Sequence, residues 1–421
     1  MLIGGGGIMS GNALIEDELG FIGRGKVLAR ILQRGDGARL MDSNGQLDAM
    51  AAEAVDVDGT YIGRDGLVKK AVLNRLRFGQ DGALVEGPRT NDTQSDGSAH
   101  ALIQAGGTIT RSVDTSDVTD PIGTNTATKF VFPFSEISSG QYLMVRYGPY
   151  SPSADAIEHL WVRGSAGGEQ MYLFMLATPN DEKLITLTTS WQKVSLGGAT
   201  ATWILFGQDR RNANMSGALS DATIYTWAIN VENEGLFSTS SIVNPDAPGV
   251  LRAADDIRYS NAGEAICKAA QGTAIVAITP EFNVADITAQ ARIFDVRPAD
   301  NADGWTLLAD DGSNSYKFKV RSGGATIADI DSSVVVPVKG RTDILAVSWK
   351  LNEYTLYANG AQEGQDTAGA VPTAMNTSLY LGQNNAAIQQ WFGKINRGVF
   401  TEPVLSSRQV ENATAVLRKA A

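Results

Sequence analysis

Turn-forming pairs recur so closely in the first 91 residues that no long helix fits between them. Each pair places Asp or Asn before Gly, which suits the positive-φ turn of a two-residue β-hairpin. The pairs are Asp36-Gly37, Asn44-Gly45, Asp58-Gly59, Asp65-Gly66 and Asp81-Gly82. This spacing predicts a run of short hairpins over residues 1–91, a compact β region rather than a catalytic domain.

The composition agrees with a turn-rich β protein of several domains. Glycine accounts for 45 of 421 residues, above the usual ~7%, and only 19% of residues are charged, below the usual ~25%. The net charge of −11 argues against nucleic acid and anionic membranes as partners. No window approaches the ~18 apolar residues of a membrane helix, and the N-terminus lacks a secretory pattern. We therefore expect a soluble protein made in a cytoplasm.

Cysteine and histidine are too scarce for several kinds of site. Cys267 is the only cysteine, and His100 and His159 are the only histidines, which excludes structural disulfides and zinc clusters. Cys267 is expected to pack as a small core residue. No G-x-S-x-G elbow, phosphate-binding loop or dinucleotide fingerprint is present. No cofactor is expected.

Residues 92–245 contain short segments in which apolar and polar side chains alternate, as in half-buried strands. In 141–147 and 159–163 one face is apolar and the other carries aromatic, basic and polar groups. The apolar face has Leu143, Val145, Tyr147, Leu160 and Val162. Further strands at similar spacing predict an antiparallel jelly-roll sandwich.

Residues 250–421 are predicted to form a second sandwich. Two prolines and a glycine in 244–249 form a linker before it. Its strands are followed by Ser406 and Gln409 in a capping-box pattern, with Val410, Ala413 and Leu417 on one helical face. The fold class is therefore mainly β, with a hairpin-rich N-terminal region, two antiparallel β-sandwich domains and one short C-terminal helix.

Four blocks in this last segment resemble the laminin-G and concanavalin A-like lectin/glucanase superfamily. They are 345–349 (LAVSW), 354–360 (YTLYANG), 379–382 (LYLG) and 391–395 (WFGKI). The resemblance implies a jelly roll in which Trp349 and Tyr357 are core aromatics. The fold serves enzymes, lectins and adhesion modules alike, so it does not fix a function.

The order of segments over residues 84–421 resembles tailed-bacteriophage virion proteins such as tail fibres, spikes and adhesins. The matching parts are 84–91 (LVEGPRTN), a carbohydrate-binding-module-like sandwich with 189–194 (TSWQKV) and 224–232 (IYTWAINVE), then 251–255 (LRAAD) and the laminin-G-like segment. The resemblance implies a virion location, contacts with other virion proteins through residues 1–91, and a homo-oligomer, a trimer by analogy.

A glycan site is the candidate binding function of the middle sandwich. Sugars stack on aromatic rings and take hydrogen bonds from polar side chains. The candidate residues, expected to converge on one sheet face, are Tyr142, Arg146, His159, Trp161, Arg163 and Tyr172. The arginines favour an acidic polysaccharide. However, residues 92–249 contain 8 basic and 16 acidic groups, which counts against an acidic ligand unless the arginines form a local positive patch.

Catalytic and metal sites are weaker alternatives. Asp329 and Asp331 lie two apart, as the paired carboxylates of a glycosidase strand do, but Ser333 stands where a third acid is expected. The acid-rich loops 300–304 and 310–314 offer oxygen ligands for Ca²⁺, although turn formation explains both.

The leading hypothesis is a non-enzymatic phage-particle protein that displays glycan-binding sandwiches for attachment to a host-cell surface polysaccharide. The alternatives are a purely structural decoration or connector protein of the virion, and a polysaccharide depolymerase.

Overall fold

The structure is a computed structural model that describes most of the chain in two compact units. The described residues are 27–34, 37–42, 60–63, 67–70, 77–79, 82–92, 100–147, 156–176, 181–199, 203–232, 237–243, 249–259, 266, 269–297, 302–372, 378–384, 386 and 388–420. The first unit takes its described residues from 1–55, 72–87 and 254–421, and the second from 56–71 and 88–253. Each unit is described by itself.

The first unit is a sandwich of two antiparallel sheets with one helix. Its nine-stranded sheet has the order β2-β1-β29-β20-β25-β26-β27, with β6 also paired to β29 and β5 to β6, and its six-stranded sheet has the order β19-β28-β21-β22-β23-β24. The bounds are β1 Val27–Arg34, β2 Gly37–Asp42, β5 Phe78–Gly79, β6 Gly82–Val85, β19 Arg258–Tyr259, β20 Gly272–Pro280, β21 Ala291–Asp295, β22 Gly304–Asp310, β23 Ser315–Ser322, β24 Ala325–Asp331, β25 Asp343–Lys350, β26 Glu353–Ala358, β27 Ala361–Asp366, β28 Leu379–Leu381, β29 Gly393–Thr401 and α3 Ser407–Ala420, with a 3-10 turn at Val284–Asp286.

Aromatic side chains fill the space between these two sheets. Trp305 of β22 packs on Trp349 of β25 with ring centroids 4.5 Å apart, and both are buried. The Tyr316 hydroxyl donates a hydrogen bond to Asp343 Oδ2 across the same core at 2.8 Å. The predicted core positions are confirmed: Trp349 is buried between the sheets, and Tyr357, 5% exposed, is buried in a cluster on the opposite face of the nine-stranded sheet.

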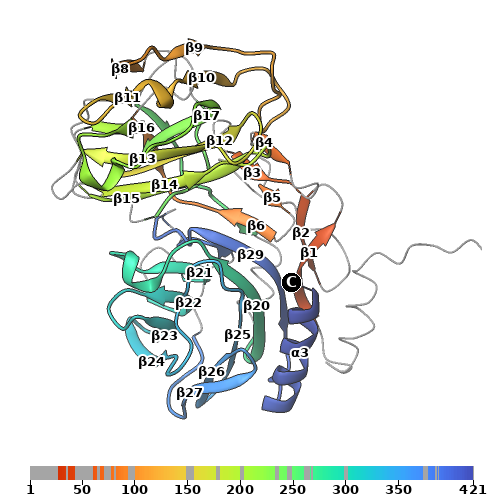
Figure 1. The fold of residues 1–421 in the computed structure, drawn as a ribbon. Coiled ribbons are helices and arrows are strands. Elements are labelled where there is room, and N and C mark those ends of the chain that lie inside the picture. Colours follow the sequence, from red (N-terminus) through yellow and green to blue (C-terminus); the bar gives the residue numbers. More distant parts are fainter. Residues whose placement is uncertain are drawn as a thin grey trace, which may run out of the picture. The chain divides into compact units, whose positions relative to one another are not determined.

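Helix α3 covers the outer face of the nine-stranded sheet, beside β20 and β25 (Figure 1). Val410, Ala413 and Leu417 are buried against that sheet, as their helical spacing predicts. The capping box is present: Ser406 N donates to Gln409 Oε1 at 3.0 Å, and Gln409 N donates to Ser406 Oγ at 3.4 Å. Capping satisfies backbone groups that a helix start leaves free.

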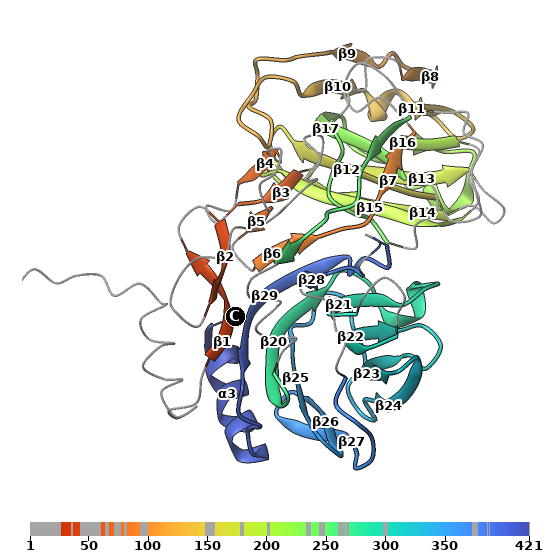
Figure 2. The same ribbon diagram turned by 180° about the vertical axis from the view of Figure 1, so that it is seen from behind.

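The second unit is also a sandwich of two antiparallel sheets (Figure 2). Its five-stranded sheet has the order β14-β13-β16-β11-β8; its seven-stranded sheet has the order β15-β12-β17-β10-β9, with β7 paired to β17 and β18 to β7; β3 and β4 form a separate pair. The bounds are β3 Thr60–Ile62, β4 Val68–Lys70, β7 Arg89–Asn91, β8 Ala101–Ala105, β9 Thr110–Ser112, β10 Thr128–Phe132, β11 Tyr142–Tyr147, β12 Ala156–Gly164, β13 Gln170–Leu176, β14 Asp181–Thr186, β15 Gln192–Ala199, β16 Trp203–Asp209, β17 Ala222–Glu232 and β18 Val250–Arg252, with 3-10 turns at Phe134–Glu136 and Ala213–Met215.

The core of the second unit lies between its two larger sheets. Phe130, Phe132 and Phe206 are fully buried there, with Phe206 packed edge-on against Phe130 at 5.2 Å. The side chains predicted to face inward from β11 and β12 all belong to this core: Leu143, Val145, Tyr147, Leu160 and Val162. The alternating pattern therefore predicted the buried faces correctly.

The mainly β fold with sandwiches and one C-terminal helix is confirmed. Three antiparallel pairs, β1–β2, β3–β4 and β5–β6, confirm the hairpin-rich N-terminal region. Within the first unit β1 and β6 pair with β29, and within the second β7 pairs with β17. The use of residues 1–91 as an attachment region stays a prediction.

Cys267 and most of the linker at 244–249 lie outside the described residues. No helix in the described ranges is long and apolar enough to cross a membrane.

Candidate functional site

The six predicted glycan-binding residues divide between the two sheets of the second unit. Tyr142 and Arg146 lie on β11 and Tyr172 on β13, which belong to the five-stranded sheet. His159, Trp161 and Arg163 lie on β12 of the seven-stranded sheet. The two groups of three therefore lie on different sheets. The expected convergence on one sheet face is therefore wrong.

The outer face of the five-stranded sheet brings the first three residues together with others. Directly paired residues share a face, so strand register gives its layout. Tyr142 is opposite Asp209, Arg146 is opposite Leu205, and Tyr172 is opposite Gly207. We call this surface the aromatic–arginine face and define it by Tyr142, Arg146, Tyr172, Phe174, Trp203, Asp209 and Arg211. Gly207 leaves the middle of it without a side chain.

Arg146 is the cation of this face that lacks an acidic partner. Its guanidinium lies over the Trp203 ring, 3.9 Å from the ring centroid, and both side chains are half-buried. Its Nε is buried without a hydrogen-bond partner, and no ion pair holds Arg146 within the part of the chain that the structure describes. Stacking on the indole fixes the guanidinium plane. Its charge stays available to an anion.

Arg211 forms a second arginine–aromatic pair, but its charge is neutralised. Its guanidinium lies 3.9 Å from the centroid of the Tyr142 ring. Asp209 accepts two hydrogen bonds from it, from Nε at 2.8 Å and from Nη2 at 2.7 Å. The hydrogen bonds to Asp209 raise the pKa of Arg211. Tyr142 and Arg146 are four residues apart on one strand, so the two pairs are about 14 Å apart, and an extended ligand would be needed to span them.

The middle of the face is closed by a polar loop. The Tyr172 hydroxyl donates to the carbonyl of Asn214 at 3.3 Å, and the Asn214 amide donates to Glu182. Tyr172 and Phe174 are therefore nearly buried, at 8% and 5% exposed. Tyr172 thus helps to hold the loop in place.

Trp203 and Arg211 were missed by the sequence analysis. The strand signal at 202–206 carries alternation that places Trp203 on the same face as Leu205, opposite Ile204 and Phe206. That signal was sufficient to find Trp203. Arg211 lies beyond the end of β16, in the turn before the 3-10 segment, where no periodicity applies.

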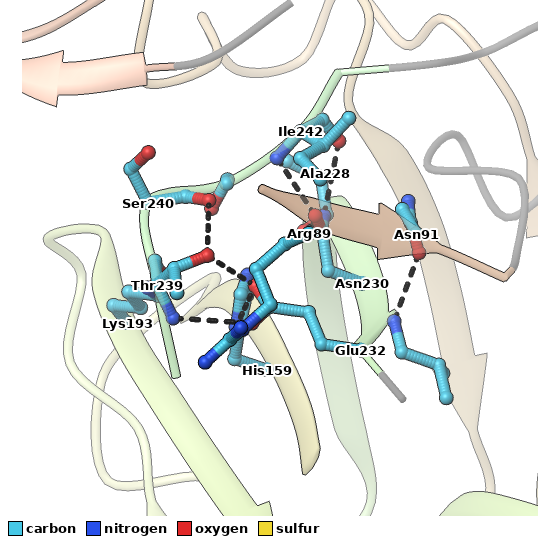
Figure 3. Close-up of polar contacts among 12 residues, drawn as sticks. Arg89, Asn91, His159, Lys193, Ala228, Asn230, Glu232, Thr239, Ser240 and Ile242 are labelled. Carbon is cyan, nitrogen blue, oxygen red and sulfur yellow. Dashed lines mark hydrogen bonds and ion pairs between the residues drawn. The ribbon is translucent and has the colours of Figure 1, made fainter. Parts of the chain in front are cut away.

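His159 belongs to a buried ion cluster on the other sheet (Figure 3). Its Nδ1 lies 3.5 Å from Glu232 Oε1, which also accepts a hydrogen bond from Thr239 Oγ1 at 2.7 Å. Burial and the charges of Lys193 and Arg252 hold the pKa of His159 well below its usual range. His159 is thus neutral and fully buried, and it contributes to packing rather than to a surface site. His100 is also buried and stacks on Tyr147.

Trp161 lies under a segment that covers the seven-stranded sheet, whereas Arg163 contacts a neighbouring strand of that sheet. Trp161 packs in a small apolar cluster with Trp227, and its Nε1 donates to Ser241 Oγ at 3.2 Å. Arg163 lies 5.9 Å from the centroid of the Tyr225 ring. Trp161 therefore anchors a covering segment and is not a platform for a ligand.

The candidate catalytic acids of the first unit are engaged by a lysine. Lys317 Nζ lies 3.2 Å from Asp329, 3.5 Å from Asp331 and 3.1 Å from Asp310. Asp310 belongs to one of the loops considered for Ca²⁺, and Lys317 supplies the cation there. In the described ranges, no three His, Cys, Asp or Glu side chains are grouped as in a metal site.

The sequence of the first unit matches a known family. Residues 270–411 match the Laminin_G_3 family, described as the concanavalin A-like lectin/glucanases superfamily. The predicted concanavalin A-like lectin domain is confirmed over these residues. Among proteins with curated functional descriptions, none matches the chain.

Solved structures with some similarity include carbohydrate-binding domains. Domain 4 of AbnA, a GH43 extracellular arabinanase from Geobacillus stearothermophilus in complex with arabinotriose, is 20% identical, with 38% of this chain and 73% of that chain covered and a TM-score of 0.32. The CBM40 of the Ruminococcus gnavus IT-sialidase is 16% identical, with 35% and 85% covered and a TM-score of 0.31. These values are too low to assign a ligand to this chain.

Proposed function

We propose that the second unit binds an acidic glycan on its aromatic–arginine face and that the chain is a non-enzymatic component of a phage particle. The observation that carries the glycan part is Arg146, a cation that is stacked on Trp203 and has no acidic partner among the described residues. A sugar carboxylate forms charge-assisted hydrogen bonds with such a group. Tyr142 and Trp203 offer apolar ring surface next to it.

The absence of an enzymatic role is supported by the setting of the two candidate acids. A glycosidase needs one carboxylic acid and one free carboxylate on either side of the scissile bond. Asp329 and Asp331 instead share Lys317, whose ammonium lies between them and Asp310. Both carboxylates thus take part in one ion-pair cluster.

The particle role is supported by the order of sequence segments over residues 84–421, which resembles virion fibres and adhesins. Host attachment joins the two parts of the proposal, because bacterial surface polysaccharides are commonly acidic. A purely structural role in the particle is the competing proposal. Two experiments would separate these roles: locating the chain in an intact particle, and adding antibodies against the second unit to particles before adsorption to host cells. Adsorption that is unchanged by the antibodies would favour the structural role.

Glycan binding is tested with the full chain on an array of acidic and neutral polysaccharides. Arg146→Gln is expected to weaken binding to acidic members by about tenfold or more, since a hydrogen bond to a charged group contributes about 1.5–3 kcal/mol. Arg163→Gln is the matched control, because Arg163 lies on the other sheet over Tyr225. Equal loss in both variants, or no binding to any acidic member, would refute the proposed site.

A further inference from the structure

The lectin-like unit carries an arginine that is buried outside its apolar core. Arg292 of β21 is only 4% exposed. It is opposite Leu308 in the register of β22, whereas Phe294 is opposite Leu307 and packs against Trp305 in the core. Arg292 therefore lies on the outer face of the six-stranded sheet. A cation is held there away from water.

Neutral groups supply the hydrogen bonds of Arg292. Gln389 Oε1 accepts from Nε at 3.1 Å and from Nη2 at 3.0 Å, and Gln290 Oε1 accepts from Nη2 at 2.9 Å. The carboxylate of Asp295 comes only to 4.0 Å from Nε. Asp295 is instead chelated by Arg297, with Nη2 to Oδ2 at 2.7 Å. The carboxylate of Asp295 is thus shared by the guanidinium groups of Arg292 and Arg297.

Arg292 Nη1 is left without an acceptor. It is buried and has no hydrogen-bond partner among the described residues. Burial and the neighbouring charge of Arg297 lower the pKa of Arg292 to about 10, against the opposing charges of Asp295 and Asp310. A buried donor without an acceptor is costly, so an anionic acceptor bound at Nη1 would be favoured.

The loop beside Arg292 adds an unused acceptor. Gly382 N donates to the carbonyl of Ile293 at 2.9 Å, which places the following residue, Gln383, next to β21. Gln383 is fully buried; its amide nitrogen donates to Asp256, while its Oε1 has no partner among the described residues. Asn384 donates to the same Gln389 oxygen that Arg292 uses, at 3.2 Å. Gln383 and Asn384 thus lie in one loop beside β21, and Asn384 joins this loop to the hydrogen bonds of Arg292.

We propose that Arg292 Nη1 and Gln383 Oε1 mark a second ligand site, on the outer face of the six-stranded sheet, for a carboxylate that also carries hydroxyl groups, as an acidic sugar does. The carboxylate accepts from Arg292, and a hydroxyl donates to Gln383. This site belongs to the lectin-like unit and does not depend on the aromatic–arginine face of the other unit.

The test uses the full chain with Arg146→Gln already introduced, so that the face proposed above does not contribute. Calorimetric titrations compare glucuronate, acetate and glucose. Glucuronate is expected to bind, and Arg292→Met is expected to weaken it at least roughly tenfold. Arg408→Gln, which removes an exposed cation on α3, is the matched control and is expected to bind normally.

Each result has a defined meaning. Binding of glucuronate but not of glucose supports the site, and equal binding of acetate shows that a free carboxylate suffices and overturns the sugar part. Undiminished binding by Arg292→Met, or no binding of any carboxylate, overturns the site. If Arg292→Met does not fold, the side-chain NMR signals of labelled arginine, assigned with Arg292→Lys, decide: glucuronate must shift the Arg292 signal more than that of Arg408.

Discussion

Glu158 is a carboxyl group inside the apolar core of the second unit. It is fully buried, and neither of its oxygens has a hydrogen-bond partner in the described part of the chain. On β12 it is opposite Leu196 of β15 and Val231 of β17, both of which belong to the core. Burial raises the pKa of Glu158 well above its usual value of 4.5. We therefore predict that Glu158→Met stabilises the protein.

The size of this effect depends on pH. At pH 4 the Glu158 carboxyl is mostly protonated in both the folded and the unfolded chain. Glu158→Met should then be more stable than the wild type by about 1–3 kcal/mol, because methionine has a similar volume and brings no unsatisfied oxygens into the core. Above pH 4.5 the unfolded carboxyl ionises while the native one stays protonated, so the wild type loses stability as pH rises. The difference in free energy of unfolding between Glu158→Met and the wild type should therefore widen by about 1.4 kcal/mol per pH unit until the native pKa is reached.

Urea unfolding between pH 4 and pH 8 measures the gap, and hydrogen exchange of β12 peptides assigns the transition to the second unit. Glu158→Gln is the matched control: it keeps the polarity but cannot ionise, so its stability should lack this pH dependence without reaching that of the methionine variant. A gap that is constant over the whole pH range, or a methionine variant less stable than the wild type at pH 7, would refute the reasoning.

Three further predictions concern stability and are checked by urea unfolding of the full chain. Arg77→Met should cost about 3–5 kcal/mol, because it removes the guanidinium that pairs with the buried carboxylates of Glu86 and Asp255; a loss below 1 kcal/mol would contradict this. Lys317→Met should cost only about 1 kcal/mol, since its acidic cluster is partly exposed, and millimolar Ca²⁺ should restore part of the loss. Ser406→Ala should cost about 1 kcal/mol by removing the helix cap, an effect that Ser406→Asp should not show.

Local patterns were sufficient for much of the fold. Alternation along 141–147 identified the core face of β11, and Asn359-Gly360, a pair that favours hairpin turns, forms the turn between β26 and β27, with φ of 52° and 90°. Pairing between distant strands was beyond such patterns. Strand β1 pairs with β29, more than 350 residues later, and no local feature of either strand specifies that partner. Sequence periodicity fixes which side chains face inward but carries no information about the neighbouring strand.

The same limit explains why half of the predicted site was misplaced. Strands β11 and β12 have the same alternation, and nothing in either sequence says that they belong to opposite sheets. His159 and Trp161 do face away from the core, as predicted, yet both are covered by the segment around Thr239 and Ser241. An outward-facing aromatic or basic residue is available to a ligand only where no later segment of the chain lies over it.

The arginines of this chain show that contacts, and not residue type, distinguish a structural role from a proposed binding role. Arg77 is buried between two carboxylates, and Arg211 is chelated by Asp209, so each compensates charge that the fold already contains. Arg146 and Arg292 are positioned mainly by neutral groups, one by an indole and one by two amides, although Arg292 also shares the carboxylate of Asp295 with Arg297. Neutral partners fix the geometry of a guanidinium without satisfying its charge. A preorganised cation whose charge is not fully satisfied is what recognition of an anionic ligand requires, and we propose that each of the two sandwiches presents one.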